Sequence, residues 1–87
     1  MVYELLCADN ITLANAEVKS VFTDKKDAIQ ALHTEIMLGK AEHGISVRTP
    51  CRLLQFHDKI AIDFGSWSDF VGLTNVTAAD FDNYGAE

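Results

Sequence analysis

The order of hydrophobic and polar residues predicts two β-strands at the start of the chain. Apolar and polar side chains alternate in residues 2–7 and again in residues 16–22, the period of a strand with one buried face. The second strand is predicted to carry four side chains on one face: Ala16, Val18, Ser20 and Phe22. Asp and Asn at 8–10 favour a turn, so the two strands are expected to pair antiparallel. Residues 11–13 either form the tip of a wide hairpin or begin the second strand.

A helix is predicted directly after the second strand, where the hydrophobic period changes. Thr23 or Asp24 is expected to cap its first turn, because a side-chain oxygen there can accept a hydrogen bond from a free backbone N–H. Four apolar residues then fall within an arc of about 100°, the width of a stripe that packs on a core. They are Ala28, Ile29, Leu32 and Ile36. This helix is expected to cover one face of a sheet.

The end of this helix has two interpretations. Either it stops at Gly39, or it runs on to a left-handed terminator at Gly44. Lys40 and His43 favour the longer helix, because basic residues are stabilised near the negative pole at its C-terminal end. Met37 and Leu38 lie off the apolar stripe. Either a loop at 45–47 covers them, or they form an exposed contact surface.

Three further strands are predicted at 51–56, 59–64 and 67–73. Turns at 57–58 or 58–59 and at 65–66 separate them. In the middle strand, the inward side chains are predicted to be Ile60, Ile62 and Phe64. The outward ones are predicted to be Lys59, Ala61 and Asp63. The last strand is predicted to carry Trp67, Asp69, Val71 and Leu73 on one face.

A short C-terminal helix is predicted to begin at Thr77, because Thr77 and Asp80 have the spacing of a capping box. It is expected to run to about Tyr84 and to end at Gly85, packed through Phe81 and Tyr84.

These elements predict one α+β domain over residues 1–87, with the order ββαβββ and a short helix at the end. An antiparallel sheet of about five strands would have one long helix on one face. The opposite face is expected to be solvated or to bind a partner, since it would carry Glu4, Glu17, Lys19, Ala61 and Asp63.

The net charge of −6 is concentrated at the end of the chain. Residues 1–59 hold eight acids against seven bases, whereas residues 60–87 hold five acids and no base. Direct nucleic-acid binding is disfavoured, because it requires clustered Lys and Arg. No apolar run is long enough to span a membrane and no export signal is visible at the start, so a cytoplasmic location without membrane association is expected. Cys7 and Cys51 are then expected to be reduced thiols.

Candidate catalytic and metal-binding chemistry is sparse. The spacing of the possible metal ligands includes no pair typical of a metal site, so neither a metal nor a cofactor is expected: Cys7, His33, His43, Cys51 and His57. A hydrolytic triad could be drawn from His57, Asp58 and Ser66 or Ser68, or His57 could meet Cys51. No nucleophile-elbow or oxyanion motif accompanies them, so we do not expect an enzyme.

The sequence favours a protein-binding function. Aromatic side chains anchor interfaces and charge steers encounter, so the predicted contact residues are Trp67, Asp69, Phe70, Asp80, Asp82, Tyr84, Met37 and Leu38. The expected partner is a basic protein, one that binds nucleic acid included. In size, acidity and simple topology the whole chain resembles small phage and mobile-element proteins that inhibit host enzymes, including some anti-CRISPR proteins, although no motif carries that resemblance. It implies an inhibitor that blocks a nucleic-acid site. The alternatives are a homodimeric structural or regulatory module and a small enzyme that uses His57.

Overall fold

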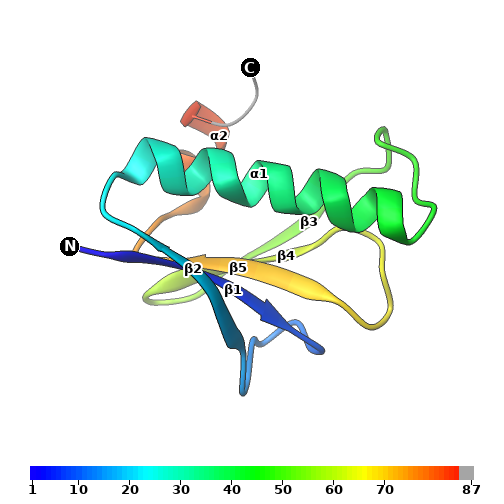
Figure 1. The fold of residues 1–87 in the computed structure, drawn as a ribbon, viewed down its shortest axis with the longest axis horizontal. Helices are drawn as coiled ribbons and strands as arrows, with labels where there is room; N and C mark the ends of the chain where they lie inside the picture. Colours follow the sequence, from blue (N-terminus) through cyan, green and yellow to red (C-terminus); the bar gives the residue numbers. More distant parts are fainter. Residues whose placement is uncertain (85–87) are drawn as a thin grey trace.

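The computed structural model describes residues 1–84, and of Tyr84 only the backbone. Its elements are β1 (Tyr3–Ala8), β2 (Glu17–Phe22), α1 (Lys25–Glu42), β3 (Arg52–Gln55), β4 (Lys59–Asp63), β5 (Phe70–Thr74) and α2 (Ala78–Tyr84). The five strands form one antiparallel sheet in the order β2-β1-β5-β4-β3, and α1 lies across one face (Figure 1). The predicted α+β fold, with its long helix and short C-terminal helix, is confirmed.

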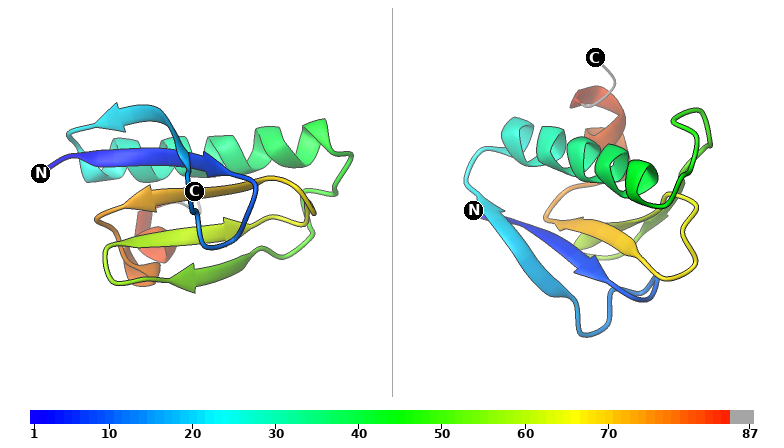
Figure 2. Two further views of the ribbon diagram at one scale, coloured as in Figure 1. Left: turned by 90° about the horizontal axis from the view of Figure 1, so that it is seen from below. Right: turned by 45° about the vertical axis from the view of Figure 1, so that its right-hand side comes forward.

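The main core lies between α1 and the sheet, which form two layers (Figure 2). All four residues of the predicted helical stripe are buried there. The predicted inward side chains Ile60 and Ile62 of β4, and Phe64 directly after it, are part of this core. Strands β1 and β5 add Leu5, Val71 and Leu73. The apolar stripe therefore sets the orientation of α1, since any other orientation would expose these side chains to water.

Both ends of α1 are defined by capping. Asp24 is the N-cap, and its Oδ2 accepts a hydrogen bond from the backbone N–H of Asp27 at 3.2 Å. The helix runs past Gly39 to Glu42, and Gly44 follows with a φ of +66°. The later of the two predicted ends is the one observed, because Gly44 adopts left-handed backbone without the steric cost of a Cβ.

β2 does not keep the predicted alternation. Leu5 of β1 pairs with Ser20, but the next residue, Leu6, pairs with Val18, so β2 contains one extra residue. A bulge of this kind moves the residues beyond it to the opposite face of the sheet. The predicted common face is therefore wrong: Val18 and Ala16 lie on the side of the sheet away from α1, and Ala16 packs there.

The face away from α1 is partly covered, against the prediction that it is solvated or free to bind. The loop 9–16 crosses the sheet in front of β5 when the molecule is seen from below (Figure 2, left). Leu13 of this loop packs with Leu6 and Ala61 in a second apolar cluster. Ala61, predicted to point outward, is fully buried. The side chain of Asn10 holds the loop, because its Oδ1 accepts the backbone N–H of Ala14 at 3.0 Å.

β5 begins at Phe70 and not at Trp67 as predicted. The chain turns before it, because the buried Oγ of Ser66 accepts the backbone N–H groups of Ser68 at 3.2 Å and Asp69 at 3.1 Å. Because those N–H groups bond to a side chain within the turn, they do not pair with a neighbouring strand. Trp67 therefore belongs to the turn and not to β5. The predicted face that Trp67 and Asp69 would share with Val71 and Leu73 is not formed.

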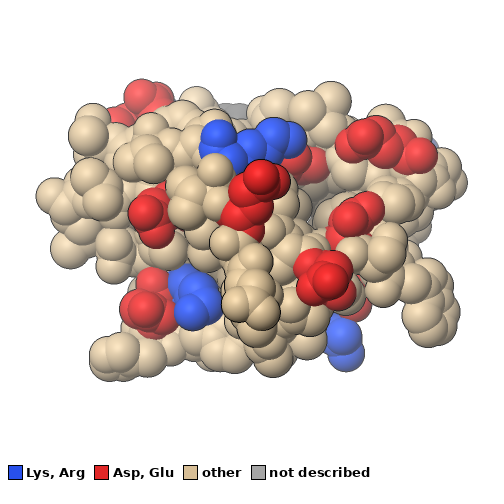
Figure 3. Space-filling view, turned by 60° about the horizontal axis from the view of Figure 1, so that its bottom comes forward, with Lys and Arg blue, Asp and Glu red and all other residues tan. Residues whose placement is uncertain are grey.

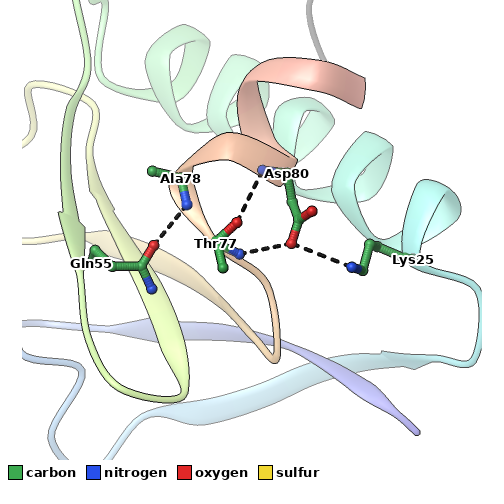
Figure 4. Close-up of polar contacts among 5 residues, drawn as sticks. All are labelled: Lys25, Gln55, Thr77, Ala78 and Asp80. Atoms are coloured by element: carbon green, nitrogen blue, oxygen red, sulfur yellow. Dashed lines mark hydrogen bonds and ion pairs between the residues drawn. The ribbon is translucent and has the colours of Figure 1, made fainter.

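α2 begins with the predicted capping box. The backbone N–H of Asp80 bonds to Oγ1 of Thr77 at 3.2 Å, and the Thr77 N–H bonds back to Oδ2 of Asp80 at 3.0 Å (Figure 4). Lys25 of α1 pairs with the same carboxylate at 3.4 Å, and Gln55 accepts the N–H of Ala78 at 2.7 Å. These contacts fix α2 beside the start of α1.

Phe81 secures α2 further, because its ring stacks on that of His33 with the centroids 4.1 Å apart. The Tyr84 side chain and Gly85, both named in the prediction for this helix, lie outside the described residues. Within residues 1–84, no helix has both the length and the apolar character needed to cross a membrane.

Candidate functional site

A cleft of about 350 Å³ opens beside the last two turns of α1. Gly39 and Glu42 of α1 form one wall, and the opposite wall comes from the end of β1 at Cys7 and the start of β5 at Phe70. The ring of Phe64 also lines the cleft, at the point where it packs against α1. The cavity is at the lower end of the range of about 300–1,000 Å³ found for ligand pockets, so it has room for one side chain or a small group.

Carboxylates dominate the polar lining of this cleft. Glu35, Glu42 and Asp69 all line it. Glu35 is paired with Lys19 of β2 at 2.5 Å. Glu42 has no basic side chain within ion-pair distance among residues 1–84. The cleft therefore has an excess of negative charge. In the space-filling view, acidic side chains lie at both ends of the face that is shown, with basic side chains between them (Figure 3).

A hydrogen bond between His43 and Asp69 closes one side of the cleft. His43 Nε2 lies 2.5 Å from Asp69 Oδ2. His43 is the C-cap of α1, where its backbone N–H donates to the carbonyl of Gly39 at 3.1 Å. Asp69 is held from the other side by Ser66. The bond therefore ties the end of α1 to the turn at 65–69.

Cys7 lines the cleft as a neutral thiol. Burial raises the pKa of this thiol, and the negative charge of Glu35 raises it further. Thiol nucleophiles need the opposite environment, in which a nearby positive charge or a helix N-terminus stabilises the thiolate. The surroundings of Cys7 therefore disfavour a role as an activated, catalytic nucleophile. Both cysteines are free, as predicted, and Cys51 is exposed.

Trp67 projects from the turn beside the cleft. Its side chain is 98% exposed, although the turn that carries it is pinned by the buried hydroxyl of Ser66. A second, shallower hollow of about 400 Å³ lies between Trp67 and Arg52. Phe70 lines both this hollow and the acidic cleft. We call the cleft together with residues 65–70 the cleft end.

The residues predicted to form one acidic contact surface are divided between two places. Trp67, Asp69 and Phe70 lie at the cleft end, where α1 finishes. Asp80 lies beside the start of α1, paired with Lys25, and α2 is at the other end of the helix (Figure 1). Hydrogen bonding from the backbone N–H of Thr77 lowers the pKa of the Asp80 carboxyl, so its charge serves the cap of α2.

The remaining predicted contact residues lie apart from the cleft. Asp82 is exposed on α2, and the Tyr84 side chain is outside the described residues. Met37 and Leu38 are 49% and 53% exposed, so the loop at 45–47 does not cover them. Neither of the two lines the cleft. Their role as a contact surface stays a prediction.

The residues of the hypothetical triad do not meet. His57 precedes β4 and Ser66 follows it. A strand of five residues spans roughly 16 Å, so the two side chains start from opposite ends of the sheet. Cys51 is at the same end of β4 as Ser66, because its neighbour Arg52 pairs with Asp63, the last residue of β4. His57 is at the opposite end of β4, so Cys51 does not meet it either. Within the described part of the chain, no three His, Cys, Asp or Glu side chains are grouped as a metal site.

Of the residues that line the cleft, only Asp69 and Phe70 were predicted as contact residues. Glu35, Glu42 and His43 were not. The seven-residue spacing of the two glutamates was a usable signal, because residues two turns apart lie on the same face of a helix. Their convergence with Asp69 could not be inferred from the chain order.

Comparisons with protein families, characterised proteins and solved structures find no match.

Proposed function

We propose that this chain is a small acidic binding protein without catalytic activity, which docks its cleft end on a basic protein. The observation that carries the proposal is the fully exposed Trp67, held in a pinned turn next to a cleft with excess negative charge. Burying an exposed indole contributes strongly to affinity, and tryptophan is among the residues that dominate interfaces. A turn that is already ordered loses little conformational entropy on binding.

The negative charge of the cleft end indicates that the partner is basic. The cleft end presents Glu42 without a basic partner within the described residues, and the chain as a whole carries −6. Such a surface attracts proteins with Lys and Arg clusters and accelerates their encounter. The finer proposal is that the partner is a nucleic-acid-binding protein and that this chain, as an inhibitor of the phage or mobile-element type, blocks its phosphate-binding surface.

The test begins with basic proteins captured from the source cell and eluted with rising salt. The affinity of a purified captured protein is then measured for wild type, Trp67→Ala and Glu42→Lys. Trp67→Ala is expected to weaken binding roughly 30-fold, the usual effect of removing an interface anchor. Glu42→Lys is expected to weaken it about tenfold and to flatten its salt dependence.

Asp58→Lys provides the matched control. It makes the same change of charge at an exposed turn, between β3 and β4, at the far end of the strands from Trp67. We expect it to change the affinity by less than about twofold at moderate salt. Equal affinities for all four proteins would contradict docking through the cleft end. If the captured protein binds an oligonucleotide, the chain should displace it, and simultaneous binding of both would reject the blocking role.

The alternative function is a homodimeric module. It is favoured by Met37 and Leu38, which lie side by side on α1 and are half exposed. The sheet edge at β2 is a poorer interface, because its bulge and Lys19 are features that prevent strands from pairing edge to edge. Light scattering at high concentration separates the two functions, because a monomer excludes the dimeric one.

A further inference from the structure

We propose that the cleft receives an arginine side chain from the basic partner. This inference rests on the proposed function and deepens it, because it names the group that the cleft recognises. Three features of the cleft define that group: its size, the aromatic rings in its lining and the carboxylates at its rim.

The size of the cleft suits a single side chain. The volume is about 350 Å³, and the space is open on one side to solvent. An extended side chain can enter while its backbone stays outside. Trp67 lines the neighbouring hollow, which shares Phe70 with the cleft, so it could contact partner residues that flank the inserted group.

The lining suits an occupant that is apolar along its stem and flat at its head. Phe70 is partly exposed and provides apolar surface, whereas Phe64 and Val71 line the cleft but are themselves buried. The three methylene groups of arginine can pack on such surface, and its planar guanidinium can stack on an aromatic face. The Phe64 ring is packed against Gly39 and is only 1% exposed, so the aromatic face available for stacking is that of the partly exposed Phe70.

The carboxylates provide the acceptors. Glu42 has both oxygens free of any ion pair within residues 1–84. Asp69 uses Oδ2 for His43, and its Oδ1 accepts no hydrogen bond from another described residue. A guanidinium has five N–H donors in a fixed fork, which can serve two carboxylates at once. An ammonium is a smaller and more strongly hydrated charge, so lysine should bind more weakly.

Other occupants fit the cleft less well. A phosphate group would meet three carboxylates and be repelled. A wholly apolar side chain would leave Glu42 desolvated without a partner, which costs free energy. A second copy of the chain is disfavoured by the repulsion between two proteins of charge −6.

The experiment uses the full chain with three short peptides of equal length: oligoarginine, oligolysine and an uncharged glycine–serine peptide. Binding is measured by calorimetry, and occupancy of the cleft is measured by the alkylation rate of Cys7, which lines it. Cys51 is exposed and does not line the cleft, so it is an internal reference. Oligoarginine is expected to slow alkylation of Cys7 several-fold and to leave Cys51 unchanged.

Two variants that each remove one exposed negative charge sharpen the test. Glu42→Gln is expected to weaken oligoarginine binding roughly fivefold, and Asp58→Asn by less than twofold. Oligolysine is expected to bind several-fold more weakly than oligoarginine, and the uncharged peptide not to protect Cys7. Equal protection by arginine and lysine, or equal binding by both variants, would overturn the inference.

The outcomes also separate this inference from the proposed function. If oligoarginine and a captured basic protein both bind while Cys7 is alkylated at its normal rate, the arginine site is wrong and docking on a basic partner stands. If neither binds at physiological salt, the proposed function fails as well. Protection of Cys7 by the uncharged peptide would indicate an apolar occupant and overturn the arginine site alone.

Discussion

The ring of Phe64 packs so closely against Gly39 that a Cβ at residue 39 would lie 2.6 Å from Cζ of the ring. Real Cβ atoms are not found at such a distance, so this position of α1 requires glycine as long as Phe64 keeps its place. The same contact places the Phe64 ring in the lining of the cleft. Core packing and the shape of the candidate site thus depend on one pair of residues.

Gly39→Ala is expected to destabilise the protein, although alanine is the better helix former by about 1 kcal/mol. Overpacking typically costs 1–3 kcal/mol and should outweigh that gain. Urea unfolding followed by circular dichroism measures the difference. Thr34→Ala, at an exposed position of the same helix, is the control and should be neutral or slightly stabilising. A more stable Gly39→Ala variant would contradict the close packing.

Leu13→Ala tests the second apolar cluster. Leu13 is buried over Gly72 on the face of the sheet away from α1. Truncating a buried leucine typically costs about 2–5 kcal/mol, and we expect a loss within that range. Ala14→Ser, at the exposed neighbouring position, should change stability by less than about 0.5 kcal/mol. If Leu13→Ala changed stability as little as Ala14→Ser, the loop 9–16 would not cover the sheet in solution.

Lys40→Met is expected to loosen the segment 43–51. Lys40 is only 4% exposed, and its Nζ donates hydrogen bonds to the carbonyls of Thr49 at 2.6 Å and Val47 at 3.3 Å. Methionine has a similar length but leaves both carbonyls without this donor, at a cost of about 1–3 kcal/mol. Hydrogen exchange of residues 43–51 should become faster. Lys26→Met, on the exposed side of α1, should leave it unchanged.

Stability should fall in mild acid because of His33. Burial lowers the pKa of His33 below the ordinary 6.5, although the backbone of Phe81 and the charge of Asp82 partly oppose the effect. The unfolded chain then binds the proton more readily than the folded one. The contribution of His33 is therefore present above pH 6.5, the pKa of the unfolded state, and is lost as the pH falls from there through the lower pKa of the folded state.

His33→Phe isolates this contribution, because phenylalanine can keep the stack on Phe81 without titrating. Urea unfolding at pH 7.5 and pH 5.5 is expected to show a larger loss of stability for wild type than for the variant. An equal loss in both proteins would assign the acid sensitivity to other groups.

Much of the fold could be predicted from the sequence, because local periodicity decides it. The stripe around Leu32 indicated a covering helix, and the alternation through Ile60 and Ile62 indicated a strand with these two side chains in the core. Asp24, Gly44 and the Thr77 capping box marked the helix ends through side-chain and backbone chemistry that acts within one turn.

The errors arose where tertiary contacts override the local pattern. A single extra residue in β2 reverses the faces beyond it without disturbing the apparent alternation. Leu13 has a left-handed φ of +62° and is buried by strands distant in sequence. Lys40 points inward because two loop carbonyls accept hydrogen bonds from its ammonium group. Nothing in the residues around Lys40 in the sequence indicates these hydrogen bonds.

The candidate site was predictable only in part for the same reason. Trp67, Asp69 and Phe70 attracted notice because aromatic and acidic residues cluster in that stretch. Asp80 lies in the same acid-rich stretch but at the other end of α1, because β5 runs the length of the sheet between them. The distribution of charge along a chain does not determine its distribution in space.

The emission of Trp67 tests the central claim most directly. It is the sole tryptophan of the chain and is almost completely exposed, so the free protein should emit at the long wavelength of a hydrated indole. On addition of a basic partner that lacks tryptophan, the emission maximum should shift to shorter wavelength in step with complex formation measured by calorimetry. A complex that forms while the emission of Trp67 stays unchanged would contradict docking through the cleft end.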